Sequence, residues 1–418
     1  MASGEASGLK RRLGLGGALV IGLGSMIGAG VFVVFAPAAA AAGHTLLIGL
    51  VIAAVVAYLN AMASAQLATA YPTSGGTYVY GRERLGEWWG FTAGWGFVVG
   101  KTASAAAMAL AFAAYVVPAP GLTQRLVGAL AVLVLGGVNV LGVHRTAWVT
   151  AVLVGLTLVS LTLVILVGWP GTGQGVPSVW CLVCVDSWYG TLQSAGLLFF
   201  AFAGYARITT LGEEVVDPRR TIPRAIQLAL AITVLIYAGV GFSALSALGP
   251  ERLAASTAPL RDVMVASGFA VLEPVVQVGA ALASLGALLT LMAGVARTML
   301  AMSRNQDLPG WLAAVHPRFA TPFRAELALT AVIAVVAMAT DLRNAIGFSS
   351  LCVLVYYAIA NASAFTQVGA TRLWPRALNV AGITGCLLLA VTLPWQSVVA
   401  GVGVLGLGLL GRRLIRLG

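Results

Sequence analysis

The first long apolar run of the chain, residues 14–40, is interrupted by Gly24-Ser25-Met26-Ile27-Gly28-Ala29-Gly30. Glycine lets a backbone leave helical geometry, because it has no Cβ atom. Inside a lipid bilayer, non-helical backbone is tolerated only where protein covers it or where it lines a cavity. If this run spans a membrane, the sequence predicts a helix that is broken within the membrane.

The composition places the chain in a membrane. Of its 418 residues, 60% are hydrophobic and 9% are charged, whereas a soluble protein of this length needs far more charge on its surface. A helix needs about 20 apolar residues to cross the hydrocarbon core. Twelve apolar runs can be marked, at residues 14–40, 44–68, 88–117, 123–142, 146–168, 190–212, 226–248, 269–300, 325–341, 345–367, 377–393 and 396–411. We therefore expect an all-α integral membrane protein with about 12 transmembrane helices.

The basic residues predict an orientation and exclude a nucleic-acid-binding protein. The formal net charge is +11, but the basic residues stand singly between apolar runs and form no patch that would bind nucleic acid. When the runs alternate across the membrane, most basic residues fall on one side, for example Lys10, Arg219 and Arg412. The positive-inside rule assigns that side, and with it both termini, to the cytoplasm. The preference for arginine over lysine, with the excess of Ala, Gly and Val, is typical of a GC-rich bacterial genome, so the expected location is a bacterial plasma (inner) membrane.

A second interruption lies in the sixth run, where Phe200-Ala201-Phe202-Ala203-Gly204-Tyr205 precedes weak helix formers. Broken helices at matching positions of two halves predict a transporter built from inverted repeats. The two halves share little direct sequence identity, so the repeat is inferred from the breaks. The expected division is a cytoplasmic tail, a first repeat (spans 1–5), an extracellular loop, a second repeat (spans 6–10), and spans 11–12 with a short tail, at residues 1–12, 13–168, 169–189, 190–367 and 368–418.

The two interruptions together predict a binding site. The freed amides of Ala29 and Gly30 begin a half-helix and carry partial positive charge, which suits a carboxylate. The freed carbonyls near Met26, Phe200 and Ala203 carry partial negative charge, which suits an ammonium group. A site that presents both is shaped for an α-amino acid. The alternative is that the glycines only allow close helix packing.

Several motifs in fixed order strengthen this interpretation. They lie at residues 24–32 (GSMIGAGVF), 71–78 (YPTSGGTY), 199–205 (FFAFAGY), 213–226 (EEVVDPRRTIPRAI), 293–298 (AGVART) and 307–309 (DLP). Through them the chain resembles the amino acid–polyamine–organocation (APC) superfamily of permeases over residues 12–393. The resemblance implies a five-plus-five inverted-repeat fold with broken helices 1 and 6 and two extra helices. It also implies secondary active transport by alternating access.

The resemblance implies the same site residues as the glycine pattern. It places the substrate carboxylate on the amides of Gly28, Ala29 and Gly30, and the substrate amine on the carbonyls of Met26, Phe200 and Ala203. Phe202 or a neighbouring aromatic residue is the expected gate over the bound substrate. The expected substrate-binding set is Met26, Ile27, Gly28, Ala29, Gly30, Phe200, Ala201, Phe202, Ala203 and Gly204.

Other polar residues are candidates for coupling or gating. Lys101 lies deep in the third run, where an ionisable residue is costly and marks a functional site unless it is structurally paired. Arg207 follows the second break and is expected to make a gating or structural contact, or to touch the substrate. Many relatives carry a lysine in the fifth span, but residues 156–160 contain none, which leaves proton coupling and exchange both open. The remaining candidates are Thr157 and Ser284, for a cation site, and Glu213 and Glu214, for a cytoplasmic gate.

The sequence thus predicts a secondary active amino acid transporter with no cofactor, whose partners are the amino acid, the lipid bilayer and protons if they are coupled. No nucleophile–base pair or metal cluster is placed at membrane depth, which argues against an enzyme. The alternatives are a polyamine or organic amine carrier, which the scarcity of acidic residues in the spans disfavours, and a non-transporting amino acid sensor. Cys181 and Cys184 could form a disulfide on the outer side. The amino acid, the coupling ion, the direction and the oligomeric state stay open.

Overall fold

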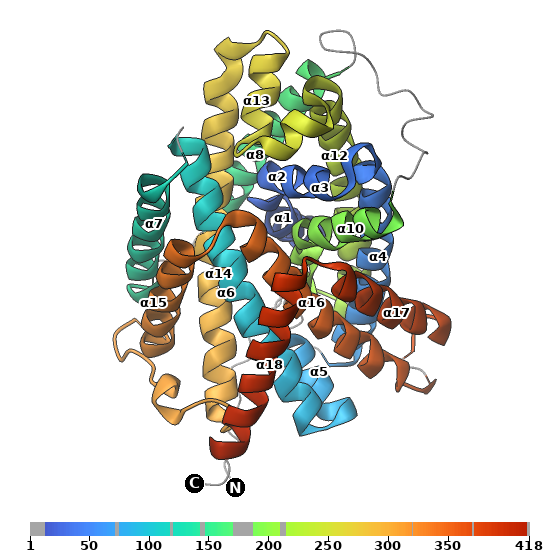
Figure 1. Ribbon diagram of the computed structural model, residues 1–418. Coiled ribbons are helices and arrows are strands. Elements are labelled where there is room, and N and C mark those ends of the chain that lie inside the picture. Colours follow the sequence, from blue (N-terminus) through green and yellow to red (C-terminus); the bar gives the residue numbers. More distant parts are fainter. Residues whose placement is uncertain are drawn as a thin grey trace, which may run out of the picture.

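The computed structural model describes residues 13–71, 75–117, 120–142, 147–169, 187–209, 215–319, 321–369 and 372–415. These residues form a bundle of helices without a sheet (Figure 1). The α-helices are α1 (Leu15–Met26), α2 (Gly30–Val33), α3 (Phe35–Ala42), α4 (Leu46–Ala70), α5 (Gly76–Leu85), α6 (Glu87–Val116), α7 (Leu122–Val140), α8 (Ala147–Val167), α10 (Trp188–Phe202), α11 (Ala206–Thr209), α12 (Pro218–Ala255), α13 (Pro259–Ala266), α14 (Glu273–Arg304), α15 (Phe323–Ala339), α16 (Leu342–Phe365), α17 (Arg376–Thr392) and α18 (Trp395–Ile415).

The helices have the length and surface of membrane spans. In the described part of the chain, nine segments are long and apolar enough to cross a membrane. Large apolar side chains stand exposed on the outside of the bundle, such as Leu130 and Val134 of α7 and Leu407 of α18. Such surface is unfavourable in water and favourable in lipid. The chain is therefore a multi-pass membrane protein, as its composition predicts.

Both predicted helix breaks are confirmed. In the first run, α1 ends at Met26 and α2 begins at Gly30. In the sixth run, α10 ends at Phe202, a short 3-10 turn covers Ala203–Tyr205, and α11 follows. Helices α6 and α16, most of whose residues are buried, run through the middle of the molecule beside these breaks (Figure 1).

Three helical segments differ from the sequence-based expectation. The apolar pattern predicts that the seventh run begins at residue 226, but α12 already begins at Pro218. Proline suits the first position of a helix, because the amide that it lacks would have no partner there. Helices α5 and α13 lie outside all twelve runs, since both are short and carry charged residues. Helix α5 marks one end of the bundle, called here the α5 end, and α13 marks the opposite end, the α13 end (Figure 1).

Candidate functional site

The two helix breaks lie against each other in the middle of the bundle. A Cβ atom placed on Gly204 would lie 2.1 Å from the Ser25 carbonyl oxygen and 2.7 Å from the Met26 nitrogen. A Cβ atom on Gly30 would lie 3.1 Å from the Cα atom of Ala201. The structure thus brings the two halves of the predicted binding set together. Only glycine allows this approach at residue 204, because the neighbouring atoms belong to the backbone.

The carbonyl groups at the breaks are bonded to side chains from other helices. The Tyr237 hydroxyl of α12 lies 2.6 Å from the Met26 carbonyl oxygen and 3.2 Å from that of Ala201. The Tyr237 ring packs against Phe202, with the ring centroids 5.0 Å apart. Phe202, the expected gate, is fully buried. One tyrosine therefore holds the end of α1 to the end of α10.

Replacing Tyr237 with phenylalanine is expected to destabilise the protein by about 1–3 kcal/mol, because two buried carbonyls lose their hydroxyl donor while the ring stays. Thermal unfolding of the purified protein in detergent would measure this loss. The matched control is Tyr58→Phe, since Tyr58 is 42% exposed on α4. Equal melting temperatures for the two variants would contradict the assigned role of Tyr237.

A lysine reaches the second break. The Nζ atom of Lys101, on α6, lies 3.5 Å from the Ala203 carbonyl oxygen. The Tyr357 hydroxyl of α16 donates to the same oxygen at 3.2 Å, and the Tyr357 ring stacks on that of Tyr205. Lys101 itself is only 9% exposed. The ammonium group thus lies on one of the carbonyls predicted to hold a substrate amine.

Of the other candidates for coupling or gating, Thr157 and Ser284 do not contact the helix breaks through any hydrogen bond found among the described residues. The Thr157 hydroxyl donates to the Leu153 carbonyl of its own helix, which is the usual role of a lone hydroxyl in a span. The Ser284 hydroxyl on α14 is buried and has no hydrogen-bond partner in the described part of the protein. Arg207 is exposed. Glu213, Glu214, Cys181 and Cys184 lie outside the described residues.

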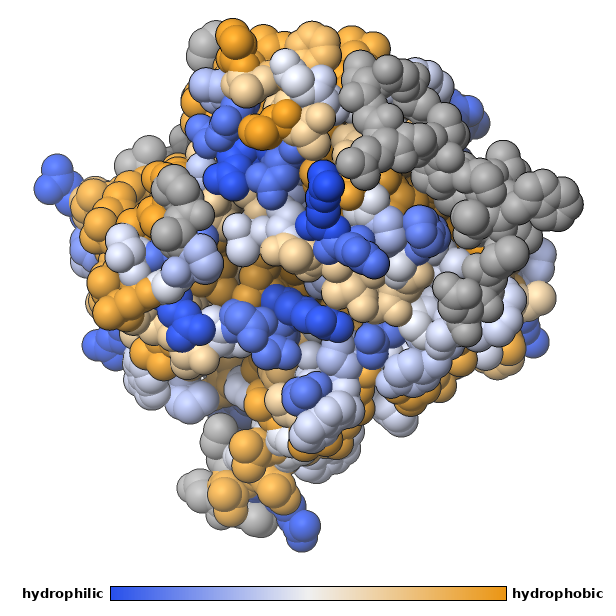
Figure 2. Space-filling model, turned by 45° about the horizontal axis from the view of Figure 1, so that its top comes forward, coloured by the Kyte–Doolittle hydropathy of each residue, from blue (hydrophilic) through white to orange (hydrophobic). Residues whose placement is uncertain are grey.

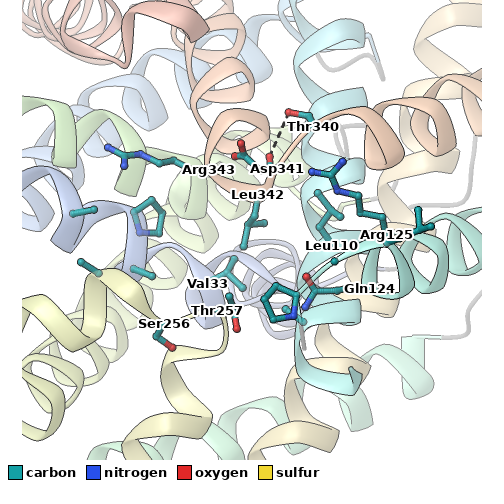
Figure 3. Close-up of a pocket in the computed structure, with 18 residues that line it drawn as sticks. Val33, Leu110, Gln124, Arg125, Ser256, Thr257, Thr340, Asp341, Leu342 and Arg343 are labelled. Carbon is teal, nitrogen blue, oxygen red and sulfur yellow. Dashed lines mark hydrogen bonds between the residues drawn. The ribbon is translucent and has the colours of Figure 1, made fainter. Parts of the chain in front are cut away.

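A cavity of about 570 Å³ opens at the α13 end. Figure 2 shows this end, where hydrophilic residues surround a hollow. The cavity lies between α3, the last turns of α6, the start of α7 and the start of α16. Arg125, Arg343 and Asp341 are its charged lining residues (Figure 3). None of the predicted binding residues lines it, so the two helix breaks lie deeper in the bundle.

An ionic cluster closes the α5 end. The Asp307 carboxylate accepts hydrogen bonds from Arg412 Nε at 2.8 Å, Arg82 Nη1 at 3.2 Å and the Tyr78 hydroxyl at 2.8 Å. Burial, together with the neighbouring carboxylate, raises the pKa of Tyr78 to about 12. This hydroxyl therefore stays protonated, as a donor to Asp307 must be.

Sequence reasoning did not assign this cluster, called here the Asp307 cluster, to the site. Its members come from α5, from α18 and from the segment after α14. The only signal in the sequence is the motif at residues 307–309. In the part of the chain that the structure describes, no three His, Cys, Asp or Glu residues are grouped so that they could hold a metal ion.

Comparison with known proteins finds relatives that are named as transporters or permeases. The profile that describes the amino acid permease family matches residues 17–405. An uncharacterized transporter of Mycobacterium tuberculosis is 58% identical over 401 residues, which cover 96% of this chain and 90% of that protein. Cationic amino acid transporter 7 of Arabidopsis thaliana is 30% identical, over 91% of this chain and 70% of that protein. The branched-chain amino acid permease BcaP of Bacillus subtilis is 25% identical, over 95% of this chain and 91% of that protein.

Proposed function

Because this chain belongs to the amino acid permease family, and is a transporter rather than an enzyme, we propose that it carries amino acids across the bacterial plasma membrane by alternating access. The observation that carries the proposal is the meeting of the two helix breaks at Gly204 and Ser25. Two half-helices whose ends meet inside a bundle present amides and carbonyls to one small volume. An α-amino acid has the matching charges.

The proposed architecture has twelve spans with both termini in the cytoplasm. Nine of the spans are the long apolar segments of the described chain. The other three are shorter: the broken helix α10–α11, α15 and α17. The breaks in spans 1 and 6 support two inverted repeats of five, at residues 13–168 and 190–367. In this arrangement the α5 end faces the cytoplasm, and the cavity at the α13 end faces outward.

In the proposed site, the amides at Gly28, Ala29 and Gly30 receive the substrate carboxylate, and the carbonyls of Met26, Phe200 and Ala203 receive its amine. All the non-glycine members of the predicted set are buried. Binding therefore requires that Tyr237 release the Met26 carbonyl and that Lys101 and Tyr357 release the Ala203 carbonyl. These exchanges connect substrate binding to the contact between the two broken helices. Such a coupling is what alternating access requires.

The proposal is tested by uptake into liposomes that contain the purified protein. Labelled amino acids are supplied outside, with and without an inward proton gradient, and in a second series the vesicles are preloaded with unlabelled amino acids. Accumulation that depends on the protein supports the transporter. Stimulation by the gradient assigns proton coupling, and stimulation by preloading assigns exchange. No amino acid uptake under any of these conditions would refute the proposal and favour an organic amine carrier or a sensor.

A further inference from the structure

Lys101 carries an inference about the substrate class, which rests on the proposed function. Lys101 is buried on α6, and among the described residues its ammonium group has one hydrogen bond, the 3.5 Å contact with the Ala203 carbonyl. No carboxylate of the described residues lies within 4.0 Å of that ammonium group. A buried ammonium without an anionic partner is costly. The described part of the chain thus holds a cation at the proposed substrate site and places no carboxylate beside it.

The acidic residues that the structure describes lie away from this position. Glu83, Glu87 and Asp307 belong to the α5 end, and Asp217 precedes α12. Glu326 is buried in α15, which packs on α7, α6 and α14, and its side chain interacts with Asn139 of α7 and Arg297 of α14. The remaining ones, Glu251, Asp262, Glu273 and Asp341, lie at helix ends or loops near the α13 end. None of the acidic residues in the described segments is thus placed to pair with Lys101, which leaves room for an anionic group of the substrate.

The charge of the cavity at the α13 end agrees with this requirement. Arg125 and Arg343 line the cavity with a single acidic residue, Asp341, which caps α16 by accepting from the Asn344 amide. Helix α6 lines the cavity at Leu110. Lys101 lies on the same helix, nearer its N-terminus and about 14 Å from Leu110 along the helix axis. A net positive entrance attracts anions and repels cations.

We propose that the transported substrate is an acidic amino acid, in which a second carboxylate pairs with the Lys101 ammonium while the α-amino group takes the place of that ammonium on the Ala203 carbonyl. Substrate and lysine are then neutral as a pair. A zwitterionic substrate would leave the buried charge uncompensated, and a cationic one would add a second charge. The site therefore differs in specificity from the relative whose name describes a cationic amino acid transporter.

The test compares acids with their amides, which have nearly the same shape. Uptake of labelled aspartate and glutamate into liposomes is measured beside uptake of labelled asparagine and glutamine, for the wild type, Lys101→Met and Lys101→Arg. The wild type should prefer each acid over its amide by about ten-fold or more in half-saturating concentration, the difference expected for one charge-assisted hydrogen bond. Lys101→Met should lose that preference, and Lys101→Arg should keep a preference for the acids.

The outcomes distinguish the acidic substrate from the proposed function. Uptake of asparagine, glutamine or leucine without a preference for the acids would overturn the acidic substrate and leave the amino acid transporter standing. An unchanged preference in Lys101→Met would show that another residue selects the acids, and would overturn the role of Lys101. The wild-type comparison needs no variant, so the acidic substrate stays testable if Lys101→Met does not fold. If no amino acid is taken up at all, the proposed function fails and the acidic substrate with it.

Discussion

A Gly204→Ala substitution is expected to reduce transport to background. The added Cβ atom would lie 2.1 Å from the Ser25 carbonyl oxygen and 2.4 Å from the Ser25 carbonyl carbon. Both are backbone atoms, so no side-chain rotation relieves the overlap, and the two broken helices must move apart. Overpacking by one methyl group costs about 1–3 kcal/mol where side chains can adjust, and more where they cannot. Because the proposed site is formed by the contact between the breaks, the separation removes the proposed binding geometry as well.

The control for this substitution is Gly155→Ala. Gly155 lies in α8, is exposed, and has no atom within 4 Å of the position that a Cβ atom would occupy. Alanine there should retain wild-type uptake and, since it favours helix by about 1 kcal/mol, should not lower the melting temperature. The measurement is uptake into liposomes at equal protein content, after size-exclusion chromatography has confirmed a single folded species. Wild-type uptake by Gly204→Ala would mean that the contact between the breaks is not part of transport.

The sequence predicts the broken helices well, because glycines and other weak helix formers destabilise a helix wherever they occur within an apolar run. Residues 24–30 contain three glycines, and residues 200–205 contain one glycine ahead of weak helix formers. Both segments can be recognised without any knowledge of their partners. The side chains that hold the breaks together cannot be recognised from the sequence in this way. Tyr237 is one of two aromatic residues in its run, and nothing local shows that it faces Met26 rather than lipid. A nearly uniform apolar helix gives little periodicity from which its buried face can be read.

The sequence marks Lys101 as a candidate but does not indicate its partner. The expected burial of the lysine follows from its depth in an apolar run, whereas the 3.5 Å contact with the Ala203 carbonyl depends on how α6 packs beside α10. The Asp307 cluster shows the same limit more strongly. Arg82 and Asp307 are separated by 225 positions in the chain. In the sequence, each charged residue of the cluster is indistinguishable from an ordinary charge in a loop or near a terminus. Only the packing of α5, α14 and α18 brings these residues together as one network.

Asp307→Asn is expected to cause the largest loss of stability among single substitutions in the Asp307 cluster. Arg412 and Asp307 have fully buried side chains, 2.8 Å apart, and the Arg412 guanidinium also lies 4.6 Å from the Trp88 ring centroid. Removing one member of a buried ion pair costs about 3–5 kcal/mol when the other charge is left uncompensated. Here the half-exposed Glu87, 3.5 Å from Arg412, remains as a partial counter-ion, so we expect the lower end of that range. The melting temperature in detergent should therefore fall by several degrees. The exposed pair of Asp217 and Arg220, whose atoms are 3.9 Å apart, provides the control, and Asp217→Asn should change stability by less than about 1 kcal/mol.

The double substitution Asp307→Asn with Arg412→Met separates the cost of a stranded charge from the value of the ion pair. Replacing both members of a buried pair by neutral groups is often nearly neutral for stability. Methionine can still pack against the rings of Trp88 and Phe91, whose centroids lie 4.6 and 5.1 Å from the Arg412 guanidinium. The double variant should then be more stable than Asp307→Asn alone, although Arg82 still loses its bond to the carboxylate at 3.2 Å. A double variant as unstable as the sum of the two single ones would contradict a stranded charge as the cause. Arg412→Met removes the unpaired charge but does not restore the packing of residue 307. An unstable double variant would therefore mean that α18 depends on Asp307 for packing rather than for charge.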